Sequence, residues 1–261
     1  MPTFTGKTFS SFYKNLLGID QSSNTGVDAT ARAIQDGAGN NTSVSISDDV
    51  LNVKPQNDNG TRTFAVQDSG STPILQVDTV NGLVGIGVGQ IPANTQFKTM
   101  GLYDFSTTAG YHNPLVANNM MFSDSGDDII QDVSMFGNGA NPATTLDISA
   151  DGTPKVAVAC YWYLQAGITL DDVRYVATAD ASVTLNFHLF SYNISGTTGD
   201  LSNGTVHANA SASATNTTAK TGTFSLDEAD IDINRVVIGF VENVTDTNDV
   251  TVSFQIKYHT R

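Results

Sequence analysis

Few residues in this 261-residue chain have the types and spacing that chemistry at a site requires. Its four histidines are His112, His188, His207 and His259. None of them forms a His-x-His or His-x3-His pair, so the sequence predicts no metal site and no catalytic histidine. His188 alternates with Phe187 and Leu189, which predicts that it lies on the opposite face of a strand from these two residues.

The single cysteine, Cys160, lies in an apolar run and is predicted to be a buried small side chain rather than a nucleophile. No Gly-x-Ser-x-Gly motif accompanies it. A glycan-cleaving enzyme would need paired carboxylates in one cleft, and no spacing of acids supports such a pair. We therefore expect no catalytic residue and no enzymatic activity.

Gly85, Gly87 and Gly89 superficially resemble a nucleotide-binding loop. Such a loop must lead into a helix whose amino terminus meets the phosphates. The residues that follow include Pro92 and show no helical pattern, so the glycines are interpreted as structural. No cofactor is expected.

Two acidic clusters lie at residues 124–128 and 227–232. Neighbouring carboxylates can supply several of the oxygen ligands that calcium takes, although neither cluster has the spacing of an EF-hand loop. Solvated acidic loops are the simpler interpretation. The second cluster could instead begin a short helix, where acids suit the helix dipole.

The densest aromatic group is Tyr161-Trp162-Tyr163. Strand alternation would place Tyr161 and Tyr163 on one face and Trp162 on the other. One face would fill a core or a subunit contact. The alternative is a platform on which a sugar ring stacks, with Trp162 as the candidate glycan contact.

Composition indicates which elements position these residues. The formal net charge is -14 at pH 7, and the acids are almost all Asp, with Glu only at Glu228 and Glu242. Asp, Asn, Ser, Thr and Gly favour turns, so we expect a helix-poor, β-rich protein. The negative surface repels phosphates, so we expect neither nucleic acid nor an anionic membrane as a partner. No apolar stretch approaches the roughly 18 residues of a membrane span, and no signal peptide is apparent.

The chain is predicted to be all-β with four regions. Residues 1–43 form an extended amino-terminal docking segment, 44–95 a β-connector and trimerisation region, and 96–150 an irregular linker. Residues 151–261 form an antiparallel, jelly-roll-like β-sandwich, because many short alternating runs are separated by turn clusters.

Within the connector, Asn81-Gly82 predicts a type I′ hairpin turn between two short strands. A meander of this size is marginally stable alone and would be stabilised if three copies packed around an axis. The predicted trimer contacts are Val77, Val84, Ile86 and Val88. The predicted docking residues, in a segment too polar to fold alone, are Phe12, Tyr13, Leu16, Leu17 and Ile19.

Two stretches carry a family resemblance. Residues 12–21 (FYKNLLGIDQ), 24–30 (NTGVDAT) and 34–41 (IQDGAGNN) together resemble the amino-terminal region of structural proteins of marine tailed bacteriophages. Residues 75–87 (LQVDTVNGLVGIG) are similar to a connector in many phage fibre and spike proteins.

The resemblance implies a homotrimer on the virion, attached to capsid or tail proteins by its amino terminus, with the sandwich pointing outward. The chain has no extended shaft repeat, which leaves a tail fibre, a head fibre and a capsid decoration protein open. The alternative is a tail fibre or spike module that binds a host receptor or glycan.

Overall fold

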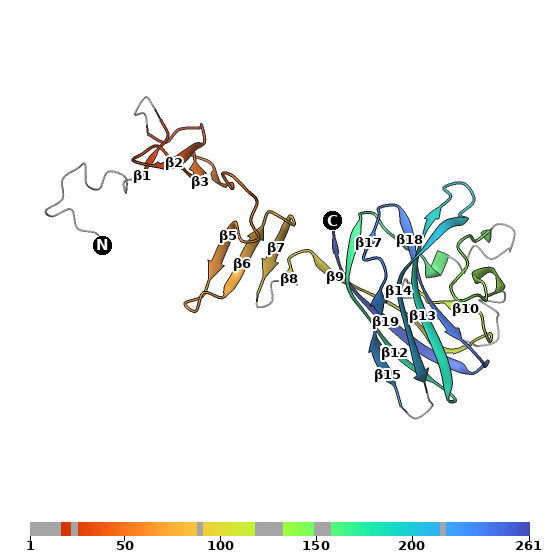
Figure 1. Cartoon of the computed structure of the whole chain (residues 1–261). Helices are drawn as coiled ribbons and strands as arrows, with labels where there is room; N and C mark the ends of the chain where they lie inside the picture. The colour runs from red at the N-terminus through yellow and green to blue at the C-terminus, as the bar shows by residue number, and fades with distance from the viewer. Residues whose placement is uncertain (1–16, 22–25, 88–90, 118–132, 149–157, 215–217) are drawn as a thin grey trace. The chain divides into compact units, whose positions relative to one another are not determined.

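The computed structural model describes the chain except for residues 1–16, 22–25, 88–90, 118–132, 149–157 and 215–217 (Figure 1). The described residues form antiparallel sheets throughout, which confirms the all-β prediction. They divide into two compact units, Met1–Ala93 and Asn94–Arg261. No helix among them is long and apolar enough to cross a membrane.

The first unit contains two small antiparallel sheets. One has the order β1-β2-β3-β4 and the other the order β5-β6-β7-β8. Their strands are β1 (Leu17–Ile19), β2 (Arg32–Asp36), β3 (Asn41–Ile46), β4 (Leu51–Val53), β5 (Phe64–Gln67), β6 (Pro73–Asp78), β7 (Leu83–Ile86) and β8 (Ile91–Pro92).

The predicted hairpin forms, but its turn is not type I′. The last strand pair is Asp78 with Leu83, so four residues form the loop, and of these only Gly82 has a positive φ, +68°. The Asp78 carboxylate accepts hydrogen bonds from the backbone N–H groups of Val80 and Asn81 and from the Asn81 side chain. This local capping favours the longer loop over the two-residue turn.

The second unit is a β-sandwich with a jelly-roll-like arrangement of two sheets. One sheet has the order β10-β18-β13-β14-β16, with β11 also paired to β18, and the other has the order β15-β12-β19-β9, with β17 also paired to β12. The elements are β9 (Thr95–Ser106), β10 (His112–Pro114), the 3-10 helix η2 (Val133–Phe136), β11 (Trp162–Tyr163), β12 (Ile168–Ala179), β13 (Val183–Ile194), β14 (Leu201–Ala214), β15 (Lys220–Thr223), β16 (Ser225–Leu226), β17 (Asp230–Ile231), β18 (Arg235–Asn243) and β19 (Asp249–Thr260).

The sandwich has two apolar clusters rather than one. Alternate residues of β13, such as Leu185 and Phe187, fill the core between the sheets. Residues of the opposite face, such as Phe190 and Tyr192, pack with Phe136 into a second cluster on the outer side of the same sheet. Strands β13 and β18 are therefore covered on both faces, which explains their nearly continuous burial.

The region 96–150 is not an irregular linker. Strand β9 pairs with β19 over most of its length, and β10 pairs with β18. At Gly101 the backbone of β9 approaches β19 closely: a Cβ there would lie 2.8 Å from the Val252 carbonyl oxygen. Within the region predicted as the sandwich, residues 158–160 form a helical turn before the short strand β11.

Candidate functional site

An apolar face covers one side of the β5–β8 sheet. Register pairs Phe64 and Val84 with Val77, and pairs Val66 and Ile86 with Leu75. Because directly paired residues of adjacent strands share a face, one side of the sheet carries six apolar side chains. We call this set the apolar face; it comprises Phe64, Val66, Leu75, Val77, Val84 and Ile86.

Most of the apolar face is open to solvent. Phe64, Val66, Val84 and Ile86 are each exposed by 39% or more, and the other two are only half-buried. The structure thus brings three of the predicted trimer contacts, Val77, Val84 and Ile86, onto one surface. Val88 lies outside the described residues.

The predicted docking residues are less fully described. Phe12, Tyr13 and Leu16 lie outside the described residues. Leu17 and Ile19 are in β1, where Leu17 is 70% exposed and Ile19 is half-buried.

A groove of about 340 Å³ lies beside β11 in the sandwich. Trp162 forms one wall, and its ring packs against Tyr258 with centroids 4.9 Å apart. Tyr163 is 47% exposed and donates a hydrogen bond to the Asn234 side chain, while Tyr258 donates one to Gln96. The groove therefore combines aromatic rings with amide groups, which are the groups that recognise sugars.

The predicted opposition of Tyr161 and Trp162 is confirmed. Tyr161 packs into the second, outer cluster, whereas Trp162 packs on the core between the sheets. Trp162 is thus partly a structural residue, and Tyr163 is the more exposed aromatic side chain of the groove.

The acids of residues 227–232 are engaged with neighbours rather than gathered around a cavity. Asp227 accepts a hydrogen bond from Asn209, and Arg261 bridges Asp230 and Asp232. The cluster at 124–128 lies outside the described residues. A third set of acids that the sequence does not single out, Asp104, Asp180 and Asp249, lies close together near the surface.

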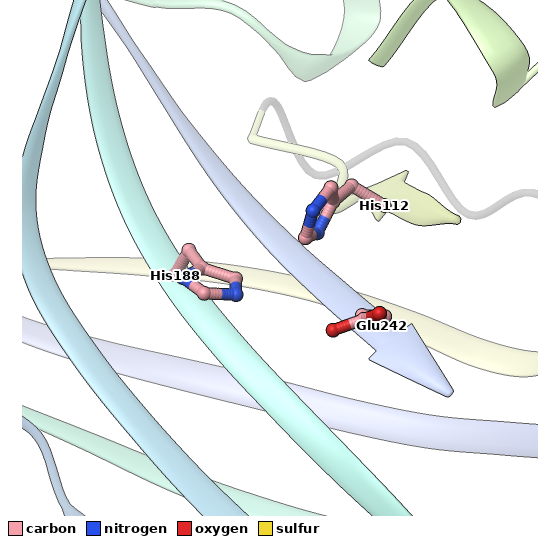
Figure 2. Close-up of side chains that lie close together, drawn as sticks. All are labelled: His112, His188 and Glu242. Carbon is pink, nitrogen blue, oxygen red and sulfur yellow. The ribbon is translucent and has the colours of Figure 1, made fainter. Parts of the chain in front are cut away.

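Two of the four histidines meet in the sandwich. His112 on β10, His188 on β13 and Glu242 on β18 place their potential ligand atoms within 4.8 Å of one another (Figure 2). The three residues are 0%, 5% and 7% exposed. We call them the His-Glu cluster.

The surroundings of the His-Glu cluster keep both rings neutral. Burial lowers the pKa of His112, an effect that the Gly139 carbonyl, the Glu242 charge and the Asn141 backbone oppose. Burial likewise lowers the pKa of His188, opposed by its hydrogen bond to Asn209. Since an ordinary histidine has a pKa near 6.5, both are uncharged at pH 7.

Sequence reasoning missed the His-Glu cluster because its members are far apart in the chain. The pairing of β10 with β18 sets His112 opposite Glu242, and that of β13 with β18 sets His188 opposite Phe240 on the same face. One signal was available in the sequence, the alternation of His188 with Phe187 and Leu189, and the face that it predicts is confirmed. Phe187 and Leu189 fill the core between the sheets, whereas His188 lies on the opposite face.

Comparisons of this chain with known proteins found similarity among solved structures. No protein-family model matches it, and no curated protein matches it. Among solved structures, it is similar to a structure of infectious bursal disease virus, Gx strain, with 14% identity and a TM-score of 0.29 over 92% of this chain and 47% of that chain.

Two further matches are to structures of the same virus. The T13 viral particle matches with 11% identity and a TM-score of 0.19, over 81% of this chain and 48% of that one. The Gt strain matches with 12% identity and a TM-score of 0.21, over 88% and 52%. The chain spans about half the length of these proteins, and similarities this low carry no argument about function.

Proposed function

We propose that the chain is a non-enzymatic structural protein of a virus particle, a homotrimeric appendage of the short-fibre or capsid-decoration type. Its amino-terminal segment attaches it to capsid or tail proteins, and its sandwich is exposed. The virion assignment rests on the resemblance of residues 12–41 and 75–87 to phage structural proteins. The sequence carries no catalytic pattern, which supports a structural role.

The observation that carries the assembly proposal is the apolar face of the β5–β8 sheet. Every fully buried large apolar side chain among the described residues belongs to the second unit. The β5–β8 sheet of the first unit instead leaves most of its apolar side chains exposed to solvent, and a lone sheet of this size is marginally stable. Covering one such side chain completely contributes about 1.5–3 kcal/mol, so packing against two further copies supplies what the single chain lacks.

A pair of substitutions tests this proposal. Val84 on the apolar face and Val176 on β12 of the sandwich are both 40% exposed. Val84→Asp places a charge inside the proposed trimer contact, so we expect it to convert the protein to single chains. Val176→Asp is the matched control and should leave the oligomer intact.

Light scattering coupled to size exclusion measures both outcomes. Circular dichroism must show that the sandwich of each variant remains folded. An oligomer that persists in the Val84→Asp variant would show that the apolar face is not the contact between chains.

A second candidate function is recognition of a host glycan in the groove beside β11. The specific observation is the grouping of Trp162 and Tyr163 with Gln96 in one depression. Tyr163→Ala is the sharper test, because Tyr163 is exposed whereas Trp162 also supports the core. We expect it to abolish saturable binding to host surface polysaccharide, with Tyr103→Ala, another exposed tyrosine, as the control. Equal binding by both variants would reject the groove as a glycan site.

A further inference from the structure

We propose that His112, His188 and Glu242 bind one divalent transition-metal ion of the zinc type, which ties three strands of the sandwich together. The three side chains converge from β10, β18 and β13, at the end of the outer apolar cluster (Figure 2). The two imidazole rings are nearly perpendicular, with centroids 5.1 Å apart.

The hydrogen bonds of His188 leave its Nε2 atom as a free acceptor. The Asn209 amide donates from Nδ2 to Asp227 Oδ2 at 2.5 Å, which directs Asn209 Oδ1 toward His188. That oxygen lies 2.6 Å from His188 Nδ1, so Nδ1 carries the proton and donates. The lone pair on Nε2 is then buried, and Nε2 has no hydrogen-bond partner.

The hydrogen bond of His112 produces the same result with the opposite nitrogen. His112 Nε2 lies 3.0 Å from the Gly139 carbonyl oxygen, which can only accept, so Nε2 carries the proton. The lone pair on Nδ1 is buried and Nδ1 also has no partner. A histidine that donates its other N–H to a carbonyl, or to an amide fixed by a carboxylate, has the arrangement typical of metal ligands.

Glu242 supplies the negative charge. Its Oε2 accepts a hydrogen bond from Asn186 Nδ2 at 2.8 Å, and none of the ion pairs found in the described part of the chain includes Glu242. A buried carboxylate facing two unpaired nitrogen lone pairs is unfavourable without a cation. One divalent ion would accept both lone pairs and neutralise the carboxylate.

The donor set indicates the class of metal. Two imidazoles and one carboxylate suit zinc and its neighbours in the first transition row, whereas calcium and magnesium prefer oxygen ligands. Tetrahedral zinc with bonds of about 2.0–2.1 Å places its ligand atoms about 3.4 Å apart, so small side-chain rotations would close the cluster. The burial of all three residues favours a structural ion that holds the short strand β10 on β18.

The test uses the full-length protein without a histidine tag, stripped with a chelator and titrated with Zn²⁺ against a chromophoric chelator. We expect one equivalent per chain and a higher melting temperature with Zn²⁺. His188→Gln and Glu242→Gln should both lose the bound equivalent and the zinc-dependent rise. Substituting Co²⁺ should give the absorption bands of a nitrogen- and oxygen-ligated site in the parent protein only.

The controls separate ligation from folding. His259→Gln alters a histidine that pairs with Asp171 in the other sheet, and it should keep the bound equivalent. Glu242→Gln removes a buried charge while keeping the shape of the side chain, so its metal-free form should melt no lower than the metal-free parent. Asn209→Ala removes the group that positions His188 and should weaken zinc affinity about 10- to 100-fold.

Two results would overturn the proposal. One is a parent protein that binds no stoichiometric Zn²⁺ or Co²⁺, which would mean that a water or a shared proton occupies the cluster. The other is binding that survives in both His188→Gln and Glu242→Gln. Neither result bears on the oligomeric state, so the proposed function is tested separately.

Discussion

Burial determines the protonation and the reactivity of several polar side chains in the sandwich. His112 and His188 have their tautomers fixed by a carbonyl and an amide at the far side of each ring. Cys160 is completely buried in the outer apolar cluster, as its apolar neighbours in the sequence predict. The same burial that makes two histidines suitable as ligands makes the thiol inert.

Cys160 provides a pH prediction. Burial raises the pKa of its thiol from 9.0 to about 12. The native chain therefore holds the neutral thiol, and the unfolded chain ionises first as the pH rises. We expect the contribution of this group to stability to be complete below about pH 9 and to be lost between pH 9 and 12.

Thiol labelling checks the prediction for Cys160. At pH 8 the folded protein should react with a disulfide reagent only at the rate of its unfolding, and denaturant should release full reactivity. Labelling of the native protein as fast as of free cysteine would contradict the burial of this thiol.

The sequence predicts a strand most clearly where apolar residues alternate with polar ones. The run from Val183 to Leu189 alternates cleanly, and it forms most of β13. Strand β9 was missed because its pattern is mixed: Lys98 shares a face with the buried Met100 and Leu102, whereas the aromatic residues Phe97 and Tyr103 are exposed. The outer cluster could not be foreseen, because only the folded chain brings Phe136 and Leu146 over β13 and β18.

Gly101 gives a prediction at the scale of the β9–β19 pair. A Cβ there would lie 2.8 Å from the Val252 carbonyl oxygen, and backbone cannot move aside as a flexible side chain can. Gly101→Ala should lower the free energy of unfolding by about 1–3 kcal/mol. Gly196→Ala is the control, since a Cβ there meets nothing within 4 Å. Chemical denaturation measures both, and equal stability of the two variants would refute the close approach.

The two units differ in how they bury apolar residues. The second unit has two apolar clusters of its own, whereas the first leaves the apolar face open. The sequence predicted this division in outline, with a sandwich at the carboxyl end and a connector before it. It placed the beginning of the sandwich too late, because residues 94–150 do not alternate clearly although they belong to that unit.

A fragment of residues 94–261 tests the independence of the second unit. We expect it to unfold cooperatively and to be a single chain, because it retains both apolar clusters and lacks the apolar face. Differential scanning calorimetry and light scattering provide the two readouts. A fragment that is unfolded, or that forms the same oligomer as the full chain, would show that the units are not separable in this way.

The mass of the full-length protein in solution tests the central claim most directly. Sedimentation equilibrium at micromolar concentration should give three times the chain mass of 27.6 kDa, because three apolar faces cover one another. A single species at the mass of one chain would contradict the account.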